Sequence, residues 1–322
     1  MATVVRVKVP GGAENLELTG VELAAPAPDE IRLRQTAIGV NFIDIYQRSG
    51  LYPLPGRIPG VEAVGIVTAA GADVTDVAVG DRIAYAGAPV GAYASERNLP
   101  AWRAIKLQPA LSDESVASVF VKGITAFMLL NRVYPVQAGS KVLVHSAAGG
   151  LGQILTRWAS RRGASVIGTV GSDAKAELAR AAGAHHVIVG RDADFAQAVA
   201  RLTDSRGVDV AYDGVGGTTL AKTLDCVRPF GVVASIGQSA GPIPKLYVEE
   251  IGPRRSLSLA RPSVMAFMNE REDYQRAAAA VLTALAKREL VGVGTVYALA
   301  DAAQAHRDLE NGRSRGALYL VP

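Results

Sequence analysis

The pattern best suited to binding chemistry is a glycine-rich turn at residues 147–152, Ala-Ala-Gly-Gly-Leu-Gly. An apolar run, residues 141–146, precedes the turn, and a helical pattern begins at Gln153. Glycines let a backbone turn sharply and approach a phosphate, and a helix N-terminus offers unpaired N–H groups to that anion. The order of strand, turn and helix therefore predicts a dinucleotide pyrophosphate loop. Alanine replaces the first glycine of the usual G-x-G-x-x-G pattern, so a glycine-rich loop in another α/β turn is the alternative.

The end of the next predicted strand, Val170-Gly171, indicates which dinucleotide would bind. A site that prefers NAD places Asp or Glu there, about 20 residues past the turn, to bind the ribose hydroxyls. Here Ser172 follows the strand and Lys175 lies three residues further on. A hydroxyl and an ammonium group suit a 2′-phosphate, which predicts NADPH. The alternatives are that Ser172 caps the next helix while Lys175 is solvated, or that Asp173 binds a ribose.

Other catalytic chemistry finds little support in the sequence. One cysteine, Cys226, and four histidines give no cluster with the spacing of a zinc site. No tyrosine is followed four residues later by lysine, so the sequence does not predict a Tyr-x-x-x-Lys proton relay. The sequence leaves room for a reductase with a weak or absent protein acid. It would suit an acceptor that needs little activation, because the cofactor carries the hydride chemistry itself.

Composition bounds the class of protein. The 322 residues are enough for about two domains. The net charge of +4 argues against a dedicated nucleic-acid surface. A single cysteine excludes an intrachain disulfide and fits a reducing compartment. We find neither a signal-peptide pattern nor an apolar run near the ~20 residues that span a bilayer, so we predict a cytoplasmic protein.

The elements that would position these residues fall into three segments. Residues 1–120 are β-rich, and glycines and prolines recur in them every ~8–12 residues, as in a barrel-like or sandwich domain. A helical pattern covers 112–133, with an interruption at Gly123. Residues 141–262 alternate strand and helix, which predicts a doubly wound parallel sheet. The mixed segment 263–322 could return to complete the first domain.

Taken in order, the motifs resemble one known family over nearly the whole chain. The chain resembles the zinc-independent NADPH:quinone oxidoreductases of the medium-chain dehydrogenase/reductase superfamily, which include zeta-crystallin. The segments that carry the resemblance are Gly39–Asp44, Arg48–Pro53, Pro59–Gly65, Gly80–Arg82, Ala147–Gly152, Gly168–Gly171 and Tyr212–Gly216.

The resemblance implies an α/β chain with two domains. A GroES-like β-rich catalytic domain would comprise residues 1–122 and 264–322, and a Rossmann NADPH-binding domain with a doubly wound parallel sheet would comprise residues 123–263. Zinc-dependent relatives carry Cys where Asn41 stands and His where Val61 stands, so the resemblance implies no metal. Family members are typically homodimers or homotetramers with sheets joined across an edge strand, which would be Ser256–Ala260 here.

Site residues follow from the resemblance by position. Asn41, Tyr46 and Tyr52 would form the catalytic pocket, although core packing is the alternative for both tyrosines. The cofactor would be bound by residues of every segment: Asn41, Tyr46, Thr125, Gly149, Gly150, Leu151, Gly171, Ser172, Lys175, Ile236, Gly237, Ser239, Arg261 and Arg315. Relatives often carry a tyrosine where Gly190 stands. Arg191 could compensate for that tyrosine, or else the preference for NADPH is weaker.

The activity implied is NADPH-dependent, metal-free reduction of a quinone. An NADPH-dependent reductase of 2-alkenals or enones is the nearest alternative, because it needs the same cofactor site with a different pocket. A cofactor-binding structural or RNA-binding protein is the alternative from another class. The expected partners are a small quinone or conjugated carbonyl and a second copy of the chain, without a membrane or nucleic acid.

Overall fold

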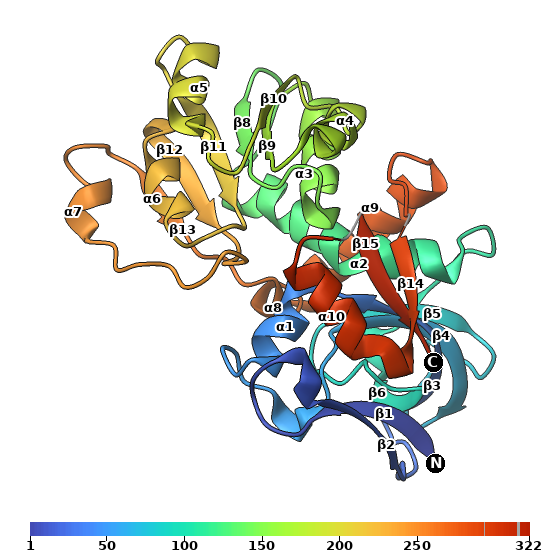
Figure 1. Ribbon diagram of the computed structural model, residues 1–322. Coiled ribbons are helices and arrows are strands. Elements are labelled where there is room, and N and C mark those ends of the chain that lie inside the picture. The colour runs from blue at the N-terminus through green and yellow to red at the C-terminus, as the bar shows by residue number, and fades with distance from the viewer. Residues whose placement is uncertain (293, 314–315) are drawn as a thin grey trace. The chain divides into compact units, whose positions relative to one another are not determined.

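The computed structural model of the protein describes residues 1–292, 294–313 and 316–322 (Figure 1). The chain divides into two compact units. Unit 1 comprises Met1–Ile124 and Met265–Pro322, and unit 2 comprises Thr125–Val264. Each unit has its own sheet and its own buried apolar cluster.

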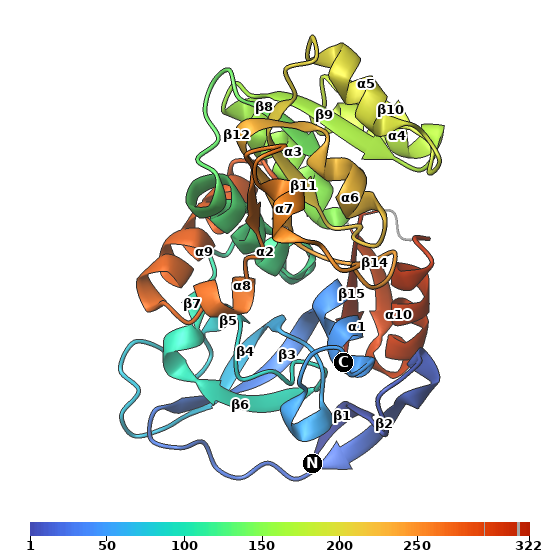
Figure 2. The ribbon, with the colours of Figure 1, turned by 90° about the vertical axis from the view of Figure 1, so that its left-hand side faces the viewer.

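Unit 1 is organised around β3, whose side chains Ile31, Leu33 and Ile38 are fully buried. β3 is antiparallel to β15, β4 and β6, so the last strand of the chain lies against an early one (Figure 2). The sheet order is β14-β15-β3-β4-β5-β7, and β1 and β2 form a separate ribbon. The strands of unit 1 are β1 (Ala2–Val7), β2 (Leu16–Val21), β3 (Glu30–Val40), β4 (Glu62–Ala70), β5 (Arg82–Ala86), β6 (Glu96–Pro100), β7 (Ile105–Lys106), β14 (Gly294–Ala298) and β15 (Ala317–Val321).

The helix α2 (Asp113–Met128) runs straight through Gly123, so the predicted interruption there is wrong. A Cβ on Gly123 would lie 2.6 Å from a methyl group of Val281, which shows that α9 packs into the space left by the glycine. Packing therefore outweighs the ~1 kcal/mol helix penalty of glycine. The other helices of unit 1, counting one that begins at the unit boundary, are α1 (Phe42–Arg48), α8 (Val264–Phe267), α9 (Arg271–Ala286) and α10 (Ala302–Glu310).

The helical segment Asp113–Val133 also corrects a second expectation. Its 21 residues are long and apolar enough to cross a membrane by length and composition, whereas the sequence suggested that no run was. Within the protein, 67% of its most apolar stretch is buried. We therefore interpret it as a core helix that is apolar because it packs on several sides.

Unit 2 is a parallel sheet with strand order β10-β9-β8-β11-β12-β13. Counted from β8, this is the 3-2-1-4-5-6 order of a Rossmann fold, in which strand order reverses between β8 and β11. α5 and α6 contribute Val199, Leu220 and Leu224 to one apolar cluster with Leu143 and Ala211 of the sheet. The strands are β8 (Lys141–Val144), β9 (Ser165–Val170), β10 (His186–Val189), β11 (Val208–Asp213), β12 (Val227–Ser235) and β13 (Ser258–Ala260), and the helices are α3 (Gly150–Arg161), α4 (Asp173–Ala181), α5 (Phe195–Leu202), α6 (Thr219–Leu224) and α7 (Val248–Ile251).

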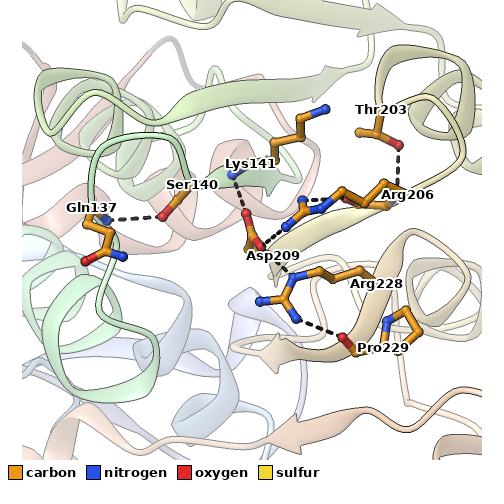
Figure 3. Close-up of polar contacts among 9 residues, drawn as sticks. Gln137, Ser140, Lys141, Thr203, Arg206, Asp209, Arg228 and Pro229 are labelled. Atoms are coloured by element: carbon orange, nitrogen blue, oxygen red, sulfur yellow. Dashed lines mark hydrogen bonds and ion pairs between the residues drawn. The ribbon is translucent and has the colours of Figure 1, made fainter.

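A cluster around Asp209 ties the beginnings of three of these strands together (Figure 3). Its carboxylate accepts hydrogen bonds from the Lys141 backbone N–H (2.7 Å), Arg206 Nη2 (2.8 Å) and Arg228 Nε (2.6 Å). Lys141 begins β8, Asp209 lies near the start of β11, and Arg228 near the start of β12. We call these four residues the Asp209 cluster. It lies at the amino ends of the strands, opposite the glycine turn.

Candidate functional site

The glycine turn follows β8 at the carboxyl edge of the sheet, as the sequence predicts. Ser146 has a positive φ of 52°, and the Gly149 N–H donates to the Ser146 carbonyl oxygen at 2.8 Å. α3 begins at Gly150, with Gly149 as N-cap. The first N–H groups of a helix have no partner within it. Those of Gly150 and Leu151 therefore lie where a pyrophosphate would be held.

The close packing of this turn explains both its last glycine and its first alanine. A Cβ on Gly152 would lie well inside van der Waals distance of the Ser146 carbonyl oxygen, so only glycine fits there. Ala147 is fully buried, and a Cβ on Gly168 would lie 2.7 Å from the Ala147 methyl group. The methyl group thus fills the space that Gly168 leaves open. The substitution is accommodated by packing against β9.

His145 holds the ends of three strands together just before the turn. Its Nδ1 lies 2.9 Å from Thr169 Oγ1 and its Nε2 lies 3.0 Å from Thr223 Oγ1. Thr223 in turn donates to Asp213 Oδ2 at 2.9 Å, at the end of β11. Burial lowers the pKa of His145, although the nearby Asp213 opposes that shift, so the imidazole is neutral. His145 therefore links the ends of these strands through hydrogen bonds as well as packing beside the turn.

The residues predicted for the 2′-phosphate lie at the end of β9. Ser172 is the N-cap of α4 by its backbone, but its side chain makes no capping hydrogen bond. Its hydroxyl is exposed, and Lys175 is half-buried in the first turn of α4. Arg191 lies beside Gly171, since a Cβ on Gly171 would be 3.6 Å from Arg191 Nε. One hydroxyl and two cationic residues therefore gather around the ends of β9 and β10.

Further predicted cofactor residues lie at the ends of β12 and β13. Arg261 Nη1 donates to Ser235 Oγ at 2.8 Å and to the Gly237 carbonyl oxygen at 3.2 Å. The Ser239 N–H donates to the Gly214 carbonyl oxygen at 3.2 Å, which joins the loop after β12 to the loop after β11. Ile236, Gly237, Ser239 and Arg261 are thus brought together. Thr125 is half-buried within α2. Arg315 lies outside the described residues.

In unit 1, the three predicted pocket residues lie on α1 and the loop after it. Asn41 is the N-cap of α1 and forms a capping box with Asp44, whose Oδ2 accepts the Asn41 backbone N–H at 2.8 Å. The rings of Tyr46 and Tyr52 meet edge to face with centroids 5.4 Å apart. Tyr46 is half-buried and Tyr52 is 37% exposed. Neither tyrosine is a fully buried core residue.

A chain of buried polar side chains below α1 was not predicted from the sequence. Tyr93 Oη lies 3.2 Å from Asp44 Oδ2 and 2.8 Å from His306 Nε2, and Arg48 Nη1 lies 3.4 Å from His306 Nδ1. Arginine can only donate, so His306 Nδ1 accepts, its Nε2–H donates to Tyr93, and the Tyr93 hydroxyl donates to Asp44. Arg48 ends the chain with a two-pronged ion pair to Glu310 of α10. We call Asp44, Tyr93, His306 and Arg48 the Asp44 chain.

Burial shifts the pKa values of Asp44 and His306, two members of this chain, so that their uncharged forms are favoured. Burial raises the pKa of Asp44 to about 7, against the Asn41 N–H that lowers it and with the Glu62 charge that raises it further. Asp44 Oδ1 is also buried without a partner in the described part of the chain. Burial and the Arg48 charge lower the pKa of His306 to about 3. Burial therefore shifts Asp44 and His306 toward their uncharged forms.

Asn41 and Val61 stand at the two positions where the zinc-dependent relatives carry Cys and His. Asn41 Nδ2 donates to Glu62 Oε1 at 2.8 Å, and Val61 is fully buried. Across residues 1–292, 294–313 and 316–322, no group of three or more His, Cys, Asp or Glu side chains is placed to hold a metal ion.

Comparison with known proteins identifies both domains. A family profile described as an alcohol dehydrogenase GroES-like domain matches residues 27–109. A second profile, described as zinc-binding dehydrogenase, matches residues 150–283. With the parallel sheet of unit 2, these matches confirm the expected combination of a GroES-like and a Rossmann domain.

Full-length relatives narrow the family further. A 2-haloacrylate reductase of Burkholderia sp. is 40% identical over 100% of this chain and 99% of its own. A quinone oxidoreductase crystal structure from Pseudomonas syringae pv. Tomato DC3000 is 39% identical, with a TM-score of 0.96 and all of both chains covered. The Escherichia coli quinone oxidoreductase solved with NADPH is 37% identical, with a TM-score of 0.95 over 99% of this chain and 100% of its own. The chain belongs to the quinone oxidoreductase family of the medium-chain dehydrogenase/reductase superfamily.

Proposed function

We propose that this chain catalyses the NADPH-dependent reduction of quinones by direct hydride transfer without a metal ion. The observation that carries the proposal is the group at the ends of β9 and β10, where Ser172, Lys175 and Arg191 gather beside a glycine turn. A hydroxyl and two cations suit the 2′-phosphate that distinguishes NADPH from NADH. The full-length similarity to quinone oxidoreductases, one of them solved with NADPH, supports the same reading.

The chain's own residues would bind and align the two reactants. Gly149, Gly150 and Leu151 would hold the pyrophosphate, and Ile236, Gly237, Ser239, Arg261 and Thr125 would line the nicotinamide side. Bound NADPH supplies a hydride, and one proton from solvent completes the hydroquinone. Asn41 would hydrogen-bond the nicotinamide ribose or the acceptor oxygen, with Tyr46 and Tyr52 shaping the acceptor pocket. Alignment of donor and acceptor supplies most of the rate in such a reaction.

Cofactor preference provides the test of this proposal. We expect the wild-type protein to oxidise NADPH faster than NADH when 1,4-benzoquinone or 9,10-phenanthrenequinone is present. Lys175→Ala should raise the KM for NADPH about tenfold, equivalent to ~1.4 kcal/mol, and leave the KM for NADH nearly unchanged. Lys8→Ala removes a lysine of unit 1 that pairs with Glu17 and serves as the control. An equal effect of Lys175→Ala on both cofactors would contradict the assignment of the 2′-phosphate.

A second candidate acceptor is favoured by one comparison. The relative that is 40% identical is a 2-haloacrylate reductase, whose name denotes a conjugated C=C substrate. The same cofactor site would serve a 2-alkenal or enone reductase. Turnover of a 2-alkenal and of 2-chloroacrylate should be compared with that of the two quinones at equal NADPH. Faster turnover of an alkene would make this candidate the better one.

The assembly and location of the protein are also proposals. We propose a homodimer joined through β13, because this strand ends the sheet of unit 2 and its outer edge has no partner strand among the described residues. Light scattering on the purified protein would give the mass directly. The single cysteine agrees with a cytoplasmic location, which cell fractionation would test.

A further inference from the structure

Glu62 is a fully buried carboxylate that the proposed reaction does not use. It begins β4 and is 1% exposed. Its Oε1 accepts the Asn41 side-chain amide at 2.8 Å and lies 3.9 Å from Lys122 Nζ. Its Oε2 accepts the Val121 backbone N–H of α2 at 2.7 Å. The carboxylate therefore links β4, α2 and the N-cap of α1.

The partners of Glu62 show how it is held. Each of them is a donor, namely an amide NH₂, a backbone N–H and an ammonium group, and this set suits an ionised carboxylate. A Cβ on Gly39 would lie well inside van der Waals distance of Glu62 Oε1 and 2.7 Å from the Ala117 carbonyl oxygen. Only glycine at position 39 leaves room for the carboxylate. The Glu62 carboxylate is therefore enclosed by its three donors and by the backbone at Gly39.

The bond to Asn41 has a directional consequence. An asparagine amide has a donor end and an acceptor end on opposite sides of one carbon, and an acceptor beside it determines which end faces which way. Glu62 Oε1 requires the NH₂ end of Asn41 to point toward β4. Asn41 is 8% exposed, so little of its surface remains for a ligand. A flipped amide would present the opposite polarity to that ligand.

We propose that Glu62 is the positioning residue of the pocket: held by the Val121 N–H and Lys122, it fixes the orientation of the Asn41 amide and thereby the polarity that Asn41 presents to the cofactor or acceptor. The inference rests on the proposed function only for the identity of that ligand. Lys122 offsets the charge of the Glu62 carboxylate, which lowers the cost of keeping that carboxylate buried beside Asn41. Glu62 itself does not touch the reactants in this proposal.

A double-mutant cycle tests whether Glu62 acts through Asn41. Glu62→Gln keeps the size but must turn an NH₂ group toward either Asn41 Nδ2 or the Val121 N–H, where two donors then face each other. We expect it to lower kcat/KM for the quinone about tenfold in the wild-type background, and less than about twofold when Asn41 is already alanine. An equal loss in both backgrounds would overturn the proposal and leave Glu62 a structural residue.

A second readout is independent of activity. The side-chain NH₂ signals of Asn41 in a ¹H–¹⁵N spectrum of the deuterated protein are assigned by their loss in Asn41→Ala. Glu62→Gln should shift these signals and speed their exchange with solvent, and Lys122→Gln should shift them less, in the same direction. Unchanged Asn41 signals in a folded Glu62→Gln protein would overturn the inference even if the wild type reduces quinones. If Glu62→Gln does not fold, Lys122→Gln decides by the same signals.

Asp209 provides the matched control in unit 2. Like Glu62, it is a buried carboxylate whose partners are all donors, and it accepts three hydrogen bonds. Asp209→Asn should lower the melting temperature and leave kcat/KM and the Asn41 signals unchanged. If Asp209→Asn reproduced the kinetic effect of Glu62→Gln, general destabilisation would account for both, and the proposal would fail. A wild-type protein without any reductase activity would instead refute the proposed function, while the spectra would still test Glu62.

Discussion

Two buried carboxylates, Asp44 in unit 1 and Asp209 in unit 2, have pKa values that are shifted in opposite directions. Asp44 is bonded to the neutral Tyr93 hydroxyl and a backbone N–H, and its pKa rises to about 7. Burial also acts to raise the pKa of Asp209, but hydrogen bonds from Arg206, Arg228 and the Lys141 N–H outweigh it and lower the pKa. Asp44 is fully buried with uncharged donors, whereas Asp209 is 5% exposed and accepts hydrogen bonds from two arginines, so depth and donor charge together separate the two acids.

The difference separates two ways of using a buried acid. The Asp209 cluster keeps its charge at neutral pH and fastens the beginnings of β8, β11 and β12 together. The Asp44 chain holds an acid and an imidazole whose pKa values are shifted toward each other's usual ranges. One centre should therefore be nearly insensitive to pH near neutrality, whereas the other should titrate there. Stability measured against pH can test this contrast.

The largest expected effect is on the pH dependence of Asp44. Its pKa is raised in the folded state, so the folded protein binds more protons than the unfolded one between about pH 4 and 7, and stability falls as the pH rises. Asp44→Asn removes that loss. The free energy of unfolding of the variant, relative to wild type, should climb by up to ~1.4 kcal/mol per pH unit across this window. Urea unfolding at several pH values measures the slope.

His306 provides the mirror image of this result. Its pKa is lowered, so wild-type stability rises with pH between about 3 and 6.5, which opposes the slope from Asp44. His306→Gln should therefore lose stability, relative to wild type, as the pH rises through that window. Where the two windows overlap, the wild-type profile should be nearly flat. Parallel profiles for wild type and both variants would refute the assigned pKa shifts.

Tyr93 connects these two groups, and its removal should have a smaller effect. Tyr93→Phe leaves the His306 Nε2–H without an acceptor and removes a donor from Asp44, both in a buried place. We expect a loss of about 2 kcal/mol in the free energy of unfolding. Tyr85→Phe is the matched control, because Tyr85 is also buried and bonds to Gln35. Only Tyr93→Phe should alter the dependence of stability on pH. A similar change in Tyr85→Phe would show that this dependence does not come from the Asp44 chain.

Most of the fold could be predicted because its signals are local. The parallel sheet of unit 2 follows from the alternating apolar runs and helical patterns of residues 141–262. The uninterrupted α2 could not be predicted, because the reason is the packing of Val281 against Gly123, 158 residues apart in the sequence (281 − 123). Local propensity is a weak guide where a distant side chain fills the space.

The places that the candidate cofactor residues of unit 2 take in the fold could be predicted, whereas the polar contacts around α1 in unit 1 could not. The glycine turn, Ser172 and Lys175 lie in two short stretches, and their spacing carries the chemistry. The Asp44 chain brings Tyr93 to a histidine 213 residues later, and no spacing rule links the two. The bond of Glu62 to Asn41 depends on the pairing of β4 with β3, which ends one residue before Asn41. A polar network built from single residues of distant elements produces no spacing pattern that a sequence analysis could detect.

The smallest expected effect is at the Asp209 cluster. Arg206 is about half exposed (48%) and Arg228 is 26% exposed, so solvent screens both ion pairs. Asp209→Asn should therefore cost only about 1 kcal/mol at pH 7 and low salt, and less in 1 M NaCl. Because the pKa of Asp209 is lowered, its contribution is present above the unfolded value and is lost as the pH falls through the folded value. The stability difference between variant and wild type should thus shrink toward pH 3, in the opposite sense to Asp44→Asn. A difference that grew with acid would mean that burial, and not the arginines, sets the charge of Asp209, and the contrast between the two units would be lost.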